Sequence, residues 1–424
     1  MLAARASSTR NVQRLARSFA TVVDTTGVKV AAVDYNQPTS SVTILVKAGS
    51  RFEPKKGVAN ALKNFAFKST TKRSTIGTVR ESDLYGGVLT SSLGREHLAL
   101  TAEFLRADAP FFVDVLSSFI TSARFTRHEF EEYVTPLVEA DTEAVSHDSA
   151  TQAIEAAHAL AFRSGLGSSL FSPAHSGLTV EDVKAFAATA FSKGNIAVLG
   201  TGIDQGTLSG LVEKAFANAA ASNEATTPTS KYFGGETRLE ASSGPQTVFF
   251  GFGTAGAPVP EVAALAAYLS PTPSVKWSKG LSPLAAVPEG TSVQTIYLPY
   301  SDASLFGLLV QGSTAAGVKE ASKVAVAALK AAAKGIKAEE LKSAVAKAKF
   351  AAASAADTRE GLVNVLGSKI LSGSPATLDA TLSSLDSVKA TGFSKTATSL
   401  ISAKPTYVVV GDSHALPYAD ELGL

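Results

Sequence analysis

The sequence predicts an α+β fold with two homologous domains, each a mostly antiparallel or mixed sheet packed with helices. Beyond a basic N-terminal segment, about 405 residues remain, which suits two domains better than a single core. Strands and helices follow each other in the same order in both halves. Within each half, runs of strands and runs of helices are segregated after the first strand–helix unit, which favours α+β over a doubly wound parallel sheet.

The N-terminal segment, residues 1–19, is predicted to be a mitochondrial transit peptide. It is rich in Ser and Ala, contains four arginines and lacks acidic residues. The arginines are Arg5, Arg10, Arg14 and Arg17. A disordered basic tail is the alternative reading. Because Arg17 and Phe19 precede the small residue Ala20 in a pattern that resembles presequence cleavage sites, we expect the mature chain to begin at Ala20.

The composition excludes several classes of function. Removing the four N-terminal arginines lowers Lys plus Arg from 39 to 35, against 37 acidic residues, so the formal charge changes from +2 to −2. This balance does not indicate a nucleic-acid-binding protein, and the basic group Lys68, Lys72 and Arg73 is read as a solvated face. The chain has no Cys, which excludes disulfides, Cys-ligated zinc, iron–sulfur ligation and thiol catalysis. No apolar run approaches the roughly 20 residues that span a bilayer.

Hydrophobic periodicity gives the same order of elements twice. In the first half, strand 42–47 precedes a helix from Gly57, extended segments 88–92 and 98–104, and a long helical stretch. The second half repeats this order with strand 247–252, helix 260–269, extended segments 292–298 and 304–311, and helix 315–334. Chance similarity is the alternative, but the matching order favours duplication.

The two halves also end alike. Thr179 is predicted to cap a helix that leads into strand 196–200, with Leu178 placed to pack against Val183. Ser384 is predicted to cap the corresponding helix before strand 407–411. The polar stretch 217–230 lacks apolar periodicity and is the predicted linker, which gives domains at 20–216 and 231–424.

Several sequence blocks resemble the mitochondrial processing peptidase and pitrilysin-like family. They are Ala48–Glu53, Gly57–Thr70, Gly86–Thr90 and Arg95–Glu96. The resemblance covers the whole predicted mature chain in architecture and these blocks in residue detail. It implies that each domain is half of a metallopeptidase-like clamshell.

In active members of that family, the helix in the second block carries an inverted zinc motif, His-x-x-Glu-His. Two imidazoles on one helix face then bind Zn²⁺, and the carboxylate between them takes a proton from the metal-bound water. Here the three positions are Asn60, Lys63 and Asn64. The family's third ligand, a Glu on a later helix, corresponds best to Glu139, seven residues after Glu132. An exposed helix face explains both carboxylates equally well.

No other catalytic set replaces the lost motif. The histidines are dispersed, which favours ordinary structural roles, and His128-Glu129 lacks the second His of a zincin helix. They are His97, His128, His147, His158, His175 and His414. Gly86-Gly87 and Gly234-Gly235 are read as turns, because no phosphate-binding loop pattern is present. The sequence therefore predicts no catalytic residue, no cofactor and no bound metal.

For a member without catalytic residues, the resemblance implies a scaffold. A substrate-recognition subunit of the matrix processing peptidase would carry a glycine-rich loop, whereas segment 273–283 has one glycine, Gly280. We therefore expect a core subunit of the respiratory cytochrome bc1 complex, peripheral on the matrix side of the inner membrane. The implied partners are a paralogous first core protein, cytochrome b, cytochrome c1, the Rieske iron–sulfur protein and small subunits.

Overall fold

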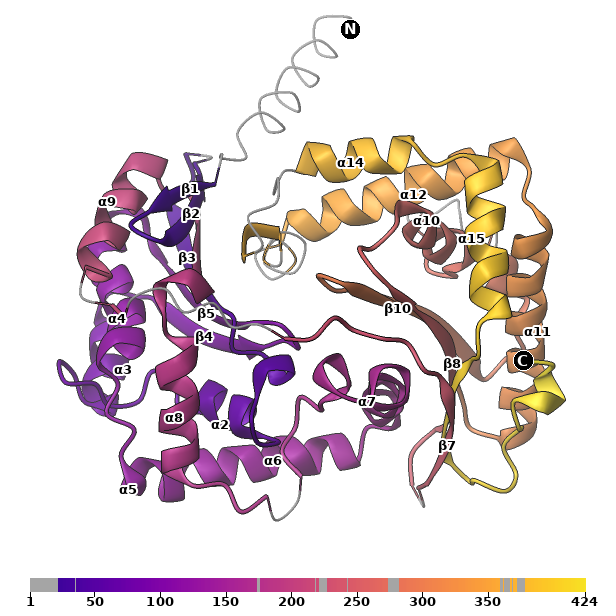
Figure 1. The fold of residues 1–424 in the computed structure, drawn as a ribbon, viewed down its shortest axis with the longest axis horizontal. Coiled ribbons are helices and arrows are strands. Elements are labelled where there is room, and N and C mark those ends of the chain that lie inside the picture. The colour runs from indigo at the N-terminus through magenta and orange to yellow at the C-terminus, as the bar shows by residue number, and fades with distance from the viewer. Residues whose placement is uncertain are drawn as a thin grey trace, which may run out of the picture. The chain divides into compact units, whose positions relative to one another are not determined.

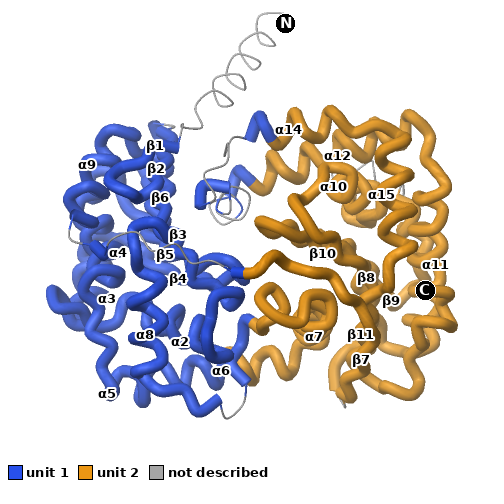
Figure 2. Tube along the Cα trace, in the orientation of Figure 1, with its two compact units in different colours: residues 1–140, 170–227, 356–380 blue, residues 141–169, 228–355, 381–424 orange. Residues whose placement is uncertain are grey.

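The computed structural model divides the chain into two compact units (Figure 2). Unit 1 comprises Met1–Ala140, Leu170–Thr227 and Ala356–Ala380, and unit 2 comprises Asp141–Ser169, Pro228–Ala355 and Thr381–Leu424. The structure describes residues 22–34, 36–173, 176–217, 219–220, 227–241, 243–273, 282–358, 361, 367, 369–371 and 378–424. The predicted transit peptide with its cleavage site, His175 and Gly280 lie outside the described residues.

Unit 1 is built on a mixed six-stranded sheet with the order β1-β2-β6-β3-β5-β4 (Figure 1). The strands are β1 (Val23–Thr25), β2 (Val28–Val33), β3 (Thr39–Val46), β4 (Val88–Leu93), β5 (Leu98–Leu105) and β6 (Ile196–Thr201). Strand β2 pairs with β6 in parallel, and the other pairs are antiparallel.

Helices cover one face of this sheet and close the core of unit 1. They are α2 (Val58–Asn64), α3 (Thr75–Leu84), α4 (Ala109–Ser122), α5 (Arg127–Glu129), the first part of α6 (Thr135–Ser146), α8 (Val180–Ala190) and α9 (Gln205–Ala215). A π-helical turn, Phe130–Val134, separates α5 from α6. Alternate side chains of the central strands, such as Val42, Ile44 and Val46, are fully or almost fully buried in this core.

Unit 2 contains a five-stranded sheet with the order β7-β11-β8-β10-β9. The strands are β7 (Gly235–Glu240), β8 (Gln246–Ala255), β9 (Thr291–Pro299), β10 (Ala303–Gly312) and β11 (Thr406–Gly411). The helices are α7 (Ser149–Phe162), α10 (Pro260–Leu269), α11 (Ala315–Lys334), α12 (Ala338–Ala356), α14 (Leu378–Asp386) and α15 (Ala390–Ser402). Helices α10, α11 and α15 cover one sheet face, and α7 covers the other.

The two sheets share one topology. Without β1, the unit 1 order β2-β6-β3-β5-β4 corresponds strand for strand to β7-β11-β8-β10-β9. The first pair in each order is parallel and the remaining three are antiparallel. Because strand order and strand direction both repeat, the predicted α+β fold with two homologous domains is confirmed.

One predicted boundary is confirmed and another is wrong. Thr179 forms a capping box with Asp182 at the start of α8, as expected. Ser384, in contrast, lies inside α14, and its hydroxyl donates to the carbonyl oxygen of Thr381. The next helix begins only at Ala390. A serine can satisfy its hydroxyl within a helix in this way, so a Ser with a following acidic residue does not define a helix start.

Candidate functional site

Helix α2 carries the motif positions, and its first turn is fixed by two neighbouring residues. Its N-cap residue, Gly57, has φ 87°, and a Cβ there would lie 2.4 Å from the Oγ atom of Ser172. The Oε2 atom of Glu53 accepts hydrogen bonds from the backbone amides of Gly57 at 3.0 Å and Ala59 at 3.4 Å. Glu53 therefore caps the helix from the preceding turn and satisfies donors that have no partner inside the helix.

The two asparagines of the motif bond to each other. Asn60 is 2% exposed, and its Oδ1 atom accepts a hydrogen bond from the Nδ2 atom of Asn64 at 3.0 Å. The Nδ2 atom of Asn60 is buried and has no hydrogen-bond partner among the residues that the structure describes. Lys63 lies in the last turn of α2, and its carbonyl oxygen accepts a hydrogen bond from Ser91. The two positions at which the resemblance predicts ligands in active relatives thus hold an amide–amide pair.

The candidate third ligand, Glu139, is exposed on α6. Glu132 is also exposed, and its Oε1 atom lies 3.1 Å from Nδ1 of His128. The π-helical turn Phe130–Val134 contains Glu132, so the spacing of seven residues does not follow a regular α-helical period. In the described part of the chain, no three His, Cys, Asp or Glu residues form a group that could hold a metal ion.

The blocks around the motif hold the backbone together near the turn between β4 and β5. A Cβ on Gly49 would lie 2.3 Å from the carbonyl oxygen of Arg95, so only glycine fits at this approach. The Arg51 amide donates to that same oxygen at 2.8 Å, and Nη1 of Arg51 pairs with Oε1 of Glu96 at 2.9 Å. Both partners of this ion pair are largely buried. Sequence reasoning identified these residues but not their contacts, which join segments about 45 residues apart.

Two ionisable groups with shifted pKa values lie in or next to the same blocks. Burial raises the pKa of Glu53 to about 7, although the amides of Ala59 and Gly57 and the charge of Lys56 act in the opposite direction. The Oε1 atom of Glu53 is buried without a hydrogen-bond partner in the described structure. Burial lowers the pKa of His97 to about 4, so this imidazole is neutral at physiological pH.

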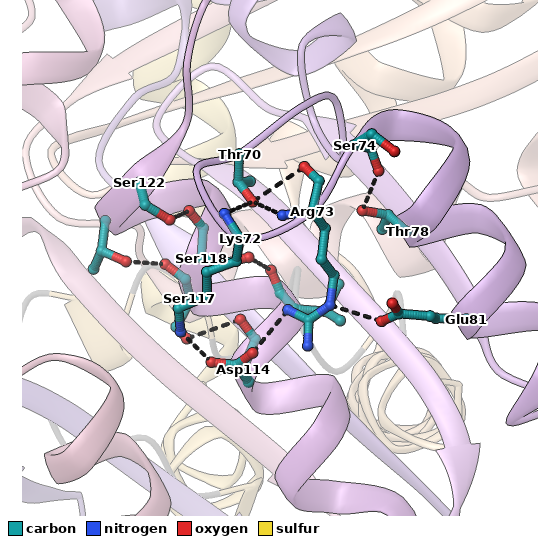
Figure 3. Close-up of polar contacts among 12 residues, drawn as sticks. Thr70, Lys72, Arg73, Ser74, Thr78, Glu81, Asp114, Ser117, Ser118 and Ser122 are labelled. Carbon is teal, nitrogen blue, oxygen red and sulfur yellow. Dashed lines mark hydrogen bonds and ion pairs between the residues drawn. The ribbon is translucent and has the colours of Figure 1, made fainter.

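The predicted basic face is largely neutralised by its own carboxylates (Figure 3). Asp114 pairs with Nζ of Lys72 at 2.5 Å and with Nη1 of Arg73 at 2.8 Å, while Nε of Arg73 pairs with Glu81 at 2.8 Å. Burial alone would raise the pKa of Asp114, but the hydrogen bonds from Lys72 and Arg73 outweigh it and lower the pKa. The group is therefore a network of surface ion pairs and not a free basic patch.

The fold and a match to a family model indicate the class of protein. Residues 29–174 match the family model described as Insulinase (Peptidase family M16). No described helix is both long enough and apolar enough to cross a membrane.

Curated relatives narrow this class. The chain is 41% identical to cytochrome b-c1 complex subunit 2 of Cryptococcus neoformans, over 99% of this chain and 98% of the relative. It is 38% identical to the protein of the same name from Yarrowia lipolytica, over 98% and 100% of the two chains. The Neurospora crassa protein of that name is 40% identical over 94% and 90%. The chain therefore belongs to the mitochondrial cytochrome b-c1 complex subunit 2 family, within the M16 peptidases.

A more distant match carries a different name. The alpha-2 subunit of the mitochondrial processing peptidase from Dictyostelium discoideum is 28% identical over 92% of this chain and 91% of the relative.

Proposed function

We propose that this protein is a core scaffold subunit of the mitochondrial cytochrome b-c1 complex, complex III, required for the assembly and stability of the ubiquinol–cytochrome c oxidoreductase. The observation that carries the proposal is the similarity, over almost the entire chain, to subunit 2 of this complex from several fungi. Both duplicated units contribute to that similarity. The protein is therefore mitochondrial and takes part in respiratory electron transport as a subunit of this complex.

We further propose that the chain is not a peptidase, because the residues on α2 do not fit zinc. A carboxamide is a poor Zn²⁺ ligand, and here the two amides of Asn60 and Asn64 already bond to each other. The Lys63 ammonium can only donate hydrogen bonds, so it cannot act as the general base that the family's glutamate provides. Of the four motif positions, only Glu139 carries a side chain that commonly binds Zn²⁺, and one carboxylate does not hold a catalytic metal.

The partners and the side of the membrane are part of the same proposal. A first core protein paralogue is the expected immediate partner, with cytochrome b, cytochrome c1, the Rieske iron–sulfur protein and small subunits as the other members of the assembly. The location we propose is the matrix side of the inner membrane, with attachment through these proteins. Crosslinking of intact mitochondria followed by mass spectrometry tests this arrangement, and crosslinks to intermembrane-space proteins alone would contradict it.

The alternative is a non-catalytic, alpha-type substrate-recognition subunit of the matrix processing peptidase, favoured by the match to the Dictyostelium protein. Blue-native electrophoresis of mitochondrial membranes separates the two functions. Migration with cytochrome b and cytochrome c1 is expected, and migration only in a heterodimer that cleaves presequences would refute the core-subunit proposal. N-terminal sequencing of the assembled protein additionally tests maturation at Ala20.

A further inference from the structure

Helix α7 belongs to the first half of the sequence but to the second unit of the structure. Segment Asp141–Ser169, which contains α7, precedes the strand β6 that completes the sheet of unit 1, yet it is part of unit 2 (Figure 2). A segment of the first sequence half is thus packed in unit 2, so the two sequence halves cannot separate without breaking this packing.

The contact between α7 and the unit 2 sheet is an apolar core of its own. The α7 side comprises small residues spaced four apart and two large residues that follow them. They are Ala153, Ala157, Ala161, Phe162 and Leu166, each at most 2% exposed. The sheet side comprises large residues from β8, β10 and β11. They are Phe249, Leu305, Leu309, Val408 and Val410, each at most 1% exposed.

Glycines in the sheet explain how a helix with small side chains can approach so closely. A Cβ on Gly307 would lie 2.3 Å from the ring of Phe249, and one on Gly251 would lie 2.9 Å from it. The end of the Phe249 ring therefore lies against glycines of two neighbouring strands. Alanines on α7 fill the remaining space, so larger or charged side chains do not fit there.

Directional contacts fix α7 in register on this sheet. Ser149 and Thr247 share a buried hydroxyl–hydroxyl bond of 2.8 Å, and Nε2 of His158 lies 2.7 Å from the hydroxyl of Tyr300. The amide of Phe233 donates to the carbonyl oxygen of Ala161 at 2.9 Å. These bonds tie both ends and the middle of α7 to segments that lie beyond residue 230.

The exchange is reciprocal. Ile370 and Leu371 come from the second half of the sequence, are 0% and 4% exposed, and pack on the sheet of unit 1. Their partners there include Leu45 and Leu199, and Nζ of Lys29 donates to the carbonyl oxygen of Leu371 at 2.6 Å. Each sheet is thus covered on one face by its own helices and on the other by a segment from the opposite half.

We infer that the two sequence halves form an interlocked, single folding unit that persists when the chain is cut between them. Each half contributes a segment that completes the core of the other, so removing the covalent link at 217–230 leaves two fragments that still share both cores. A simple two-domain chain joined by a linker behaves differently, because its halves separate once the linker is cut.

The experiment is performed on the full chain with a protease recognition site inserted between Pro228 and Thr229, which are both exposed. After complete cleavage, the two fragments are expected to remain together in size-exclusion chromatography and native mass spectrometry, and to separate only in denaturant. Separation of the cut wild-type fragments in native buffer at micromolar concentration would overturn the inference.

Matched variants locate the attachment on α7. Ala157→Glu places a carboxylate in the α7–sheet core and is expected to raise the separated fraction of cut protein about tenfold or more. Ala159→Glu introduces the same residue on the exposed face of the same helix and is expected to leave the fragments joined. Equal separation by both variants would show that the buried face of α7 does not hold the halves. If Ala157→Glu does not fold before cleavage, the inference is tested by whether the fragments of the cut wild-type chain separate in native buffer.

Discussion

Replacing Glu53 with glutamine is expected to stabilise the isolated protein at and above neutral pH and to remove part of its pH dependence. Glu53 caps α2 through one oxygen, while its other oxygen is buried without a partner in the described structure. The negative charge therefore loses hydration that the two backbone amides only partly replace. Glutamine keeps an acceptor oxygen for the cap and carries no charge.

The size of the effect follows from the pKa of Glu53, which burial raises from 4.5 to about 7. A carboxyl group whose pKa is higher in the folded than in the unfolded chain weakens folding as the pH rises. The contribution of Glu53 to the free energy of unfolding is then highest below pH 4.5, falls between pH 4.5 and 7, and is constant above that window. At about 1.4 kcal/mol per pKa unit, the total loss is about 3 kcal/mol.

Urea unfolding followed by circular dichroism at several pH values between 4.5 and 8 measures this dependence. Because the buried imidazole of His97 gains stability over nearly the same range, the difference between the two proteins is the quantity to follow. Glu53→Gln is expected to gain stability relative to the wild type as the pH rises across the window, and to exceed the wild type at pH 8. Glu139→Gln is the matched control, because it removes one carboxylate from an exposed helix position. An unchanged pH slope in Glu53→Gln would refute the assignment of this pH dependence to the buried cap.

Three further outcomes are expected. The wild type should bind no stoichiometric zinc, and the Asn60→His, Lys63→Glu, Asn64→His variant should bind zinc weakly and cleave presequence peptides poorly. The reason is that the groups that orient such ligands commonly account for 10- to 100-fold in affinity or activity. Metal analysis and a cleavage assay measure both outcomes, and chelator-sensitive cleavage by the wild type would contradict the loss of the zinc site. Arg238→Lys should lower the free energy of unfolding by about 2 kcal/mol, since the guanidinium donates to three backbone carbonyls near the C-terminus. Thermal unfolding measures this change, and a value below about 0.5 kcal/mol would show that these three hydrogen bonds do not stabilise the fold. Gly49→Ala should reduce the melting temperature by several degrees, because the new methyl group meets a backbone carbonyl; an unchanged melting temperature would show that the turn shifts freely.

Local signals predicted the elements that have sharp ends. The helices at 260–269 and 315–334 have these same bounds in the structure, with Pro at the first helical position of one and a Thr cap before the other. Strands β2 and β7 were not predicted. The sequence of β2, VKVAAV, is almost continuously buried and gives no alternation, and that of β7, GETRLE, is a mainly polar edge strand.

The site could be predicted only in part. Sequence spacing placed Asn60, Lys63 and Asn64 on one helix, as the structure has them. The pairing of Arg51 with Glu96 depends on a turn that brings distant segments together. Neither this pairing nor the placement of α7 in unit 2 has a local signal, because each depends on contacts between segments that are far apart in the sequence.

The position of β11 in the sequence has a consequence for the order of assembly. This strand lies between β7 and β8 and pairs with both, yet it is formed by Thr406–Gly411, close to the C-terminus. A ribosome or a translocation pore that delivers the chain from its N-terminus releases this strand among the last residues. Until then, β7 has no partner strand in the sheet and one edge of β8 is open. Newly made protein therefore passes through a period of raised aggregation risk that ends only when β11 has been delivered, and holding chaperones are most needed during that period.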